Sequence, residues 1–217
     1  LLLANMLGQA MNNYLFLDYF KNTNALAVLN VISIAAVLVL APFVSKIAVR
    51  FGKKEAGALG MLGAGIIYVL LYFLKVKSIP LFLGTVGVGL FNLIVWAFIT
   101  DIIDYQEVAT GKREDGTVYA VYSFARKVGQ ALAGGLGGFV LTAIGYVSEA
   151  SVQAPGVPER IYTVATLVPG VCYLVVFLVM QFYYPLSRGE VEKNTVILQE
   201  RHGNQKTGGK EGIRSEI

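Results

Sequence analysis

Most polar residues that packing alone does not explain lie between positions 100 and 146 of this 217-residue chain. Five acids and two basic residues stand close together in the first part of that stretch: Asp101, Asp104, Glu107, Lys112, Arg113, Glu114 and Asp115. Groups of opposite charge at such short spacing can form ion pairs. Because the stretch joins one long apolar segment to another, we expect these pairs in a connection between two helices.

A second polar pattern runs into the apolar segment that follows. Ser123, Lys127, Gln130 and Gly134 recur at steps of four, three and four residues, which places them on one face of a helix. If that helix begins near Tyr119, Lys127 lies about 12 Å along it at 1.5 Å per residue. At that depth in a membrane, a lysine either faces a water-filled path or extends its ammonium group back to the surface. The residues alone leave both open, although Gln130 favours the interior.

The elements that position these residues are apolar segments long enough to cross a membrane. Hydrophobic residues make up 55% of the chain and charged residues 15%, which is typical of membrane proteins. Four windows lack Asp, Glu, Lys and Arg and are long enough to cross about 30 Å of hydrocarbon or nearly so: 56–74, 78–100, 128–148 and 161–187. Two further segments near the start bring the prediction to six spans, at about 1–20, 25–45, 56–74, 79–100, 118–145 and 161–184.

Lysine and arginine are distributed unevenly between the connections. Fourteen of the 18 follow the second, fourth or sixth predicted span, and cytoplasmic loops carry such an excess. Both ends of this sequence are therefore expected in the cytoplasm, and the basic balance needs no nucleic acid to explain it. Residues 186–217 are expected to form a cytoplasmic tail with a short helix at most, followed by disorder. The start at Leu1, without Met, suggests a fragment.

Few residues offer catalysis or metal binding. Cys172 lies in an apolar span and His202 in the tail, and the chain has no second cysteine or histidine, so we expect neither a His/Cys metal cluster nor a cofactor. Asp115-Gly116 followed by Ala125-Arg126 is faintly similar to the signature of lipid-headgroup transferases. Since the spacing differs and no Asp follows Asp115, we favour a protein that is not an enzyme and keep the membrane enzyme as the alternative.

Amides and one aromatic residue are candidate ligands for a polar solute. Asn5, Gln9 and Asn12 share one helical face, and Asn92 lies four residues before Trp96 on another segment. The amides either line a cavity or bond to neighbouring helices. Trp96 either stacks on a sugar ring or belongs to the aromatic belt at the membrane surface. Considered alone, Trp96 slightly favours the aromatic belt.

Taken together, several of these motifs resemble a known family. The residues that carry the resemblance are Asp101-Ile102-Ile103-Asp104-Tyr105-Gln106-Glu107, Thr110-Gly111-Lys112-Arg113, Tyr119 to Ser123, Lys127 and Gly145-Tyr146. They are similar to the tenth and eleventh helices of the glycoside–pentoside–hexuronide:cation symporters, the major-facilitator branch that includes melibiose and glucuronide carriers. The resemblance extends over all six spans. It implies an all-α polytopic membrane protein in which residues 1–185 equal the C-terminal half of a twelve-helix fold.

The resemblance also implies a function and a set of site residues. It implies symport of a sugar or glycoside with Na+ or H+ across the cell membrane, by alternating access between two six-helix halves. It places Lys127 in the central cavity. The predicted substrate-binding residues are Lys127, Asn92, Trp96, Asn5, Gln9, Asn12, Gln130 and Ser123. The predicted gating or inter-half pairing residues are Asp101, Asp104, Tyr105, Glu107 and Arg113. The resemblance implies a partner, an N-terminal six-helix half that this sequence lacks. The main coupling-ion site is expected in that half.

Overall fold

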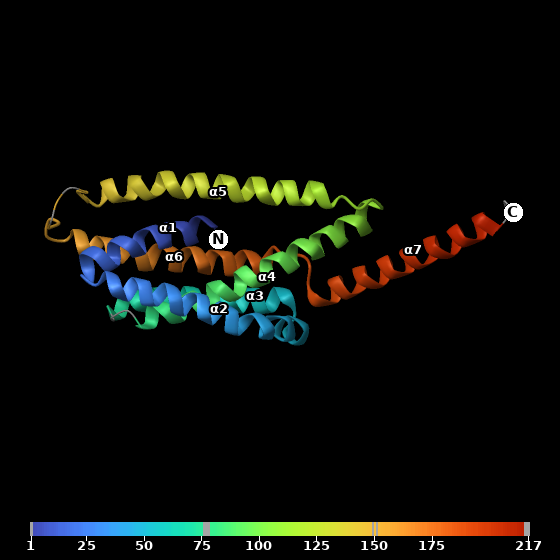
Figure 1. Cartoon of the computed structure of the whole chain (residues 1–217), viewed down its shortest axis with the longest axis horizontal. Coiled ribbons are helices and arrows are strands. Elements are labelled where there is room, and N and C mark those ends of the chain that lie inside the picture. Colours follow the sequence, from blue (N-terminus) through green and yellow to red (C-terminus); the bar gives the residue numbers. More distant parts are fainter. Residues whose placement is uncertain (1, 76–78, 149, 151, 215–217) are drawn as a thin grey trace.

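The computed structural model describes residues 2–75, 79–148, 150 and 152–214, and over these residues the regular elements are all helical (Figure 1). In chain order they are α1 (Leu2–Tyr14), the π-helix η1 (Leu15–Tyr19), α2 (Thr23–Phe51), α3 (Lys53–Leu74), α4 (Ile79–Thr110), α5 (Asp115–Ala143), α6 (Val157–Phe182) and α7 (Arg188–Arg214). Each of the six apolar segments predicted from the sequence coincides with a helix or, for the first, with α1 and η1 together. The all-α prediction is confirmed for this part of the chain.

Within the described residues, three helices are long and apolar enough to cross a membrane: residues 23–44 of α2, then α3 and α6. Two of the other three predicted spans differ in ways that lower this signal. Helix α1 has only 13 residues, and α5 contains Arg126 and Lys127 within its length. The count of six spans therefore stays a prediction.

The core of the bundle lies where α3 packs against α4 and α6. Glycines allow the closest approach between α3 and α6. A Cβ added at Gly65 would lie 2.7 Å from Leu174 Cδ2, and one added at Gly170 would lie 3.0 Å from Val69 Cγ2. Small residues at such contacts let helices pack tightly in lipid, where association depends on close packing rather than on the hydrophobic effect.

The turn between α2 and α3 requires a glycine. Gly52 has φ of 93°, in the region that favours glycine, and a side chain there would collide with the carboxylate of Glu55. The turn brings Lys53 and Lys54 to the first positions of α3, directly after the end of α2.

Helix α5 lies beside the core rather than within it (Figure 1). It contacts α1 most extensively and α4 to a smaller extent. Only Ala133 and Gly137 are buried on it, and large apolar residues such as Phe139, 77% exposed, face outward. A Cβ added at Gly134 or Gly138 would meet no atom within 4 Å. Most of the α5 surface is therefore open.

The tail differs from its prediction. Where the sequence favours a short helix at most, α7 runs from Arg188 to Arg214 and extends beyond the bundle (Figure 1). Ion pairs between residues one turn apart support its first half, with Arg188 Nε 2.8 Å from Glu192 Oε1 and Lys193 Nζ 2.8 Å from Glu190 Oε1. Leu198 is buried, and α7 packs against α4. These tertiary contacts stabilise α7 as far as His202.

Candidate functional site

A pocket of about 560 Å³ lies between α1, α2 and α4, with one tyrosine each from α3 and α6 in its wall. Its polar residues are Asn5, Gln9, Asn12, Asn13, Asn30, Ser33, Asn92, Tyr68 and Tyr173. Its apolar residues include Leu26, Leu29, Ile34, Val37, Leu38 and Val88. None of the described residues that line this pocket carries a formal charge, so they present donors, acceptors and apolar surface to a neutral part of a ligand.

Four predicted substrate-binding residues share this pocket. Asn5, Gln9 and Asn12 line it from α1, and Asn92 lines it from α4. The helical spacing on α1 thus placed three amides on the correct common face. The structure brings them to an open space rather than only to neighbouring helices. Whether a sugar binds to them stays a prediction.

Hydrogen bonds fix part of the amide set. The Tyr173 hydroxyl donates to Asn5 Oδ1 at 2.9 Å, and the ring of Tyr173 packs edge-on against that of Tyr68, with centroids 5.5 Å apart. The carbonyl oxygen of Asn12 is buried and accepts no hydrogen bond from the described residues. Buried acceptors are normally satisfied, so Asn12 Oδ1 is an exception beside the pocket, and the side chain would have to turn for this oxygen to meet a ligand.

Sequence reasoning missed several residues of this pocket. Asn30 and Ser33 lie three residues apart on α2, within an apolar segment that has no charged residues. This pair of polar residues was the sequence signal that could have placed α2 at the pocket. Tyr68 and Tyr173 stand in the middle of apolar helices, where an aromatic residue normally belongs to the core. No local pattern distinguishes them from core residues.

Lys127 and its neighbours on α5 do not line this pocket. Lys127 and Ser123 are exposed and Gln130 is partly buried. The Lys127 ammonium group has no hydrogen bond or ion pair with any residue that the structure describes. The α5 stripe is thus an open polar surface separate from the amide pocket, and its role in binding stays a prediction.

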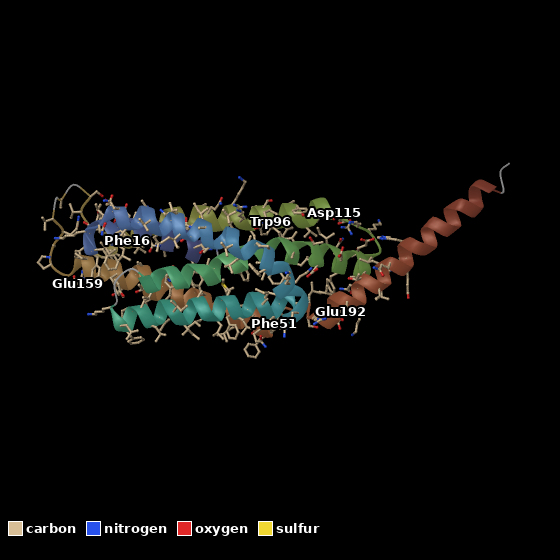
Figure 2. All side chains as sticks on the ribbon, turned by 60° about the horizontal axis from the view of Figure 1, so that its bottom comes forward. Phe16, Phe51, Trp96, Asp115, Glu159 and Glu192 are labelled. Carbon is tan, nitrogen blue, oxygen red and sulfur yellow. The ribbon has the colours of Figure 1, made fainter. Side chains whose placement is uncertain are left out.

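Trp96 also lies outside the pocket, where α4 meets α5. It is 51% exposed, and its ring centroid is 5.6 Å from that of Tyr122, with the planes at 63°. Figure 2 shows the labelled Trp96 beside α5. The contact links the two helices that carry Asn92 and Lys127.

The predicted loop residues form a charged cluster around Arg113. Its guanidinium group lies 3.1 Å from Asp104 Oδ1, 2.9 Å from Glu107 Oε2 and 3.1 Å from Asp115 Oδ2. Hydrogen bonds to Glu107 and Asp115 raise the pKa of Arg113 above its ordinary value, so it stays charged. The cluster ties the end of α4 to the start of α5. Tyr105 is exposed and takes no part in these ion pairs.

Glu107 also receives the tail. His202 Nε2 lies 2.7 Å from Glu107 Oε1, and the Arg201 guanidinium donates to the main-chain carbonyls of Glu107 and Val108. Burial raises the pKa of the Glu107 carboxyl, but hydrogen bonds from His202 and Arg113 outweigh burial and leave that pKa below its ordinary value. Sequence reasoning gave His202 no partner, because 95 residues separate it from Glu107.

Asp101 has a different partner. It is 5% exposed, and Lys53 Nζ lies 2.6 Å from its Oδ1 atom. Burial raises the pKa of the Asp101 carboxyl more than Lys53 lowers it. Asp101 thus pairs with the first residue of α3, within this chain. Pairing between two halves stays a prediction.

Apolar helices around an uncharged polar pocket, with ion pairs gathered at the helix ends, are typical of polytopic membrane transporters. The family described as MFS/sugar transport protein matches residues 2–188. The chain therefore belongs to the major facilitator superfamily, in the branch of the glycoside–pentoside–hexuronide symporters.

Curated relatives support this assignment. The chain is 34% identical over 166 residues to the glucuronide carrier protein homolog of Escherichia coli strain K12, covering 74% of this chain and 36% of that protein. It is 30% identical over 186 residues to the uncharacterized symporter YjmB of Bacillus subtilis strain 168, covering 83% and 39%. It is 35% identical over 144 residues to a protein of E. coli K12 described as a candidate sulfoquinovose importer, covering 63% and 30%. The chain thus spans well under half the length of these relatives, whose names describe a carrier, a symporter and an importer.

Proposed function

We propose that this chain forms the C-terminal six-helix half of a sugar or glycoside symporter that is driven by Na+ or H+ and works by alternating access in the cell membrane. The family assignment and the names of the relatives support this proposal. So does the match of this chain to about a third of each relative. The observation that carries it is the uncharged pocket lined by amides and tyrosines.

The chemistry of that pocket suits a carbohydrate. Sugar hydroxyls both donate and accept hydrogen bonds, and amides do the same. Carbohydrate C–H faces are apolar and fit against walls such as Leu29 and Val88. The volume of about 560 Å³ lies within the range of roughly 300–1,000 Å³ that small-molecule sites occupy. We assign Asn12 Oδ1 as an acceptor for a substrate hydroxyl.

The proposed role of Lys127 is to bind an anionic group of the substrate. Its ammonium group is exposed and has no acidic partner in the described part of the chain. One relative is a glucuronide carrier homolog and another is described as a candidate sulfoquinovose importer, and both names refer to sugars that carry an acidic group. A carboxylate or sulfonate would pair with Lys127 while the hydroxyls reach the amides.

The charged groups at the ends of α4 are proposed to act in gating. The Arg113 cluster and the pair of Lys53 with Asp101 hold the ends of α3, α4 and α5 together. Opening of the cytoplasmic side by alternating access would require such contacts to change. We assign the main coupling-ion site to the N-terminal half, as the resemblance implies.

Uptake into membrane vesicles tests this proposal. The full-length carrier that contains this chain would be reconstituted, and accumulation of a radiolabelled glucuronide would be measured under an imposed Na+ gradient, an imposed H+ gradient and neither. We expect accumulation against a concentration gradient under one of the two ion gradients. Asn12→Ala should weaken it, whereas Asn24→Ala, an exposed asparagine outside the pocket, should not. Equal uptake with and without any ion gradient would rule out symport.

A further inference from the structure

We propose that the first half of α7, residues 188–202, is a latch on the end of α4 that tightens as the surrounding pH falls and then slows the transport cycle. The latch depends on the proposed function for two points: the placement of these helix ends at the cytoplasmic surface, and the gating role of the Arg113 cluster. It adds a control of the transport rate to that function.

One face of the latch is buried. Asn194 is 7% exposed and Leu198 is 6% exposed, and they lie four residues apart, so they share one face of α7. Arg201 and His202 follow Leu198 by three and four residues and continue this face. Among the described residues, α4 is the helix against which α7 packs most extensively. This continuous face is therefore the docking side of the latch.

The end of the latch meets one residue of α4, Glu107. His202 Nε2 lies 2.7 Å from Glu107 Oε1, and Arg113 Nη1 lies 2.9 Å from Glu107 Oε2. The Arg201 guanidinium donates to the main-chain oxygens of Glu107 and Val108, both at 3.3 Å. These oxygens belong to the last turn of α4, where carbonyls lack intrahelical donors. One carboxylate thus connects the latch to the arginine that ties α4 to α5.

Two features make this docking reversible. Asn194 Nδ2 is buried and has no hydrogen-bond acceptor among the residues that the structure describes, and the burial of an unpaired donor weakens an association. The His202 side chain is 51% exposed, so water competes for its contact with Glu107. We therefore infer an equilibrium between docked and released latch, which the charge of one residue can shift.

The residue whose charge shifts this equilibrium is His202. An ordinary histidine gains its second ring proton between about pH 8 and pH 5. The pKa of Glu107 lies below its ordinary value, so its carboxylate stays ionised while His202 becomes charged. A neutral imidazole can still donate one hydrogen bond to that carboxylate, but without the attraction of opposite charges. Docking therefore tightens as pH falls, until Glu107 itself becomes protonated in more acidic solution.

The other charged groups of this region do not reverse that direction. Arg201 contacts the main chain of Glu107 and stays charged throughout. Arg113 contacts the second carboxylate oxygen of Glu107 and also pairs with Asp104 and Asp115. Figure 2 shows Asp115, at the start of α5, and Glu192, on the latch, at the same end of the molecule.

A docked latch should slow transport without changing sugar affinity. Because Glu107 is shared, docking holds the Arg113 cluster in its present arrangement, and opening of the cytoplasmic side would require that cluster to change. None of the latch residues lines the amide pocket. The expected effect is therefore on the maximal rate, with the apparent affinity for sugar unchanged.

Spin labels measure docking without any need for transport. In a cysteine-free full-length carrier, labels would be attached at Gln199→Cys on α7 and Thr117→Cys on α5, both at exposed positions. The distribution of distances between them would be recorded at about pH 5.5 and about pH 8, on either side of the ordinary histidine range. We expect the ratio of docked to released latch to be about two- to fivefold higher at the acidic pH, the range for a partly exposed ion pair.

Three variants assign the effect to His202. His202→Ala should release the latch and remove its dependence on pH. His202→Lys should keep the latch docked at both pH values, because its charge is permanent over this range. Lys193→Ala is the matched control, since it also removes a basic group from α7 but Lys193 pairs with Glu190 on the same helix. It should behave as the wild type.

Exchange of labelled for unlabelled glucuronide, in vesicles with equal pH on both sides, measures the rate. Between about pH 8 and about pH 5.5, the wild-type maximal rate should fall about two- to fivefold relative to that of His202→Ala. Equal wild-type distance distributions at the two pH values, or equal distributions of the His202→Ala and Lys193→Ala variants, would overturn the latch. Parallel rate profiles of wild type and His202→Ala would overturn its control of transport. If the wild type exchanges no glucuronide, the proposed function fails, while the spin labels still decide the latch.

Discussion

The ammonium group of Lys53 lies 2.6 Å from the carboxylate of Asp101, which is 5% exposed and therefore depends on this one cation for its charge balance. The pair joins the first residue of α3 to the end of the predicted fourth span. Both residues line a pocket between α2, α4 and the start of α7. The position of this pair makes it a structural link as well as a candidate gating contact.

Removal of Lys53 alone should destabilise the protein more than removal of the whole pair. Lys53→Met leaves Asp101 buried without a partner, which costs about 1 to 3 kcal/mol. The double variant Lys53→Met with Asp101→Leu removes the stranded charge as well, so it should recover much of that loss. Thermal unfolding in detergent, followed by circular dichroism, measures both. A double variant that is as unstable as Lys53→Met would contradict this account.

Acidification should weaken the contribution of Glu107 to stability. Because the folded-state pKa of Glu107 lies below its ordinary value, its stabilisation is fully present above that ordinary value and is lost as pH falls through the lower folded value. Glu107→Gln should flatten the stability profile in that acidic window. Asp101 acts in the opposite sense, since its raised pKa favours the folded protein as the carboxyl becomes protonated. Unfolding midpoints of Glu107→Gln and Asp101→Asn across an acidic pH series measure these contributions. A Glu107→Gln profile that parallels the wild-type profile would refute the first prediction.

The amide pocket should determine sugar affinity. Asn12→Ala removes the buried acceptor. We expect the apparent affinity for sugar to fall about two- to tenfold, because this is the usual net contribution of one neutral hydrogen bond to binding. Tyr173→Phe removes the hydroxyl that orients Asn5 and should have an effect of similar size. Uptake at varied sugar concentration separates affinity from maximal rate, with Asn24→Ala as control. If the Asn12 and Asn24 variants match, Asn12 does not bind the substrate.

Lys127 should distinguish acidic sugars from neutral ones. Lys127→Ala should weaken uptake affinity for a glucuronide about tenfold to a hundredfold, the usual range for a hydrogen bond to a charged group, and should change a neutral glycoside much less. Lys127→Arg should retain part of the affinity because the charge remains. Paired uptake curves for the two substrates measure the difference. Undiminished glucuronide affinity in Lys127→Ala would remove Lys127 from the site.

Two glycines on α3 should respond oppositely to the same substitution. At Gly65 a new Cβ would lie 2.7 Å from Leu174 Cδ2 and 3.1 Å from the Leu174 main-chain nitrogen, so Gly65→Ala should cost about 1 to 3 kcal/mol. At Gly63 nothing lies within 4 Å, so Gly63→Ala should be neutral or stabilise the helix by about 0.5 to 1 kcal/mol. Unfolding midpoints of the two variants provide the test. Equal midpoints would mean that α3 and α6 are not in this close contact.

The spacing of residues along the sequence predicts which side chains share one face of a helix. It does not predict which side chains from different helices come together. Steps of four and three residues were enough to place Asn5, Gln9 and Asn12 on one face, and that face lines a pocket. The partners Tyr173 and Asn30 come from other helices, and only packing reveals that they face the same space. The extent of α7 was missed for the same reason, because His202 contacts Glu107 on α4, 95 residues away in sequence. The α5 stripe is a third case, since Lys127 is exposed and lies outside the pocket, and its role in binding stays a prediction.

The open surface of α5 has a consequence for assembly. Only Ala133 and Gly137 are buried on this helix, so large apolar residues such as Phe139 leave water only against lipid or another protein surface. The Trp96–Tyr122 contact and the Arg113 cluster anchor the first half of α5 to α4. The side that carries Lys127 is therefore an unoccupied surface on an anchored helix.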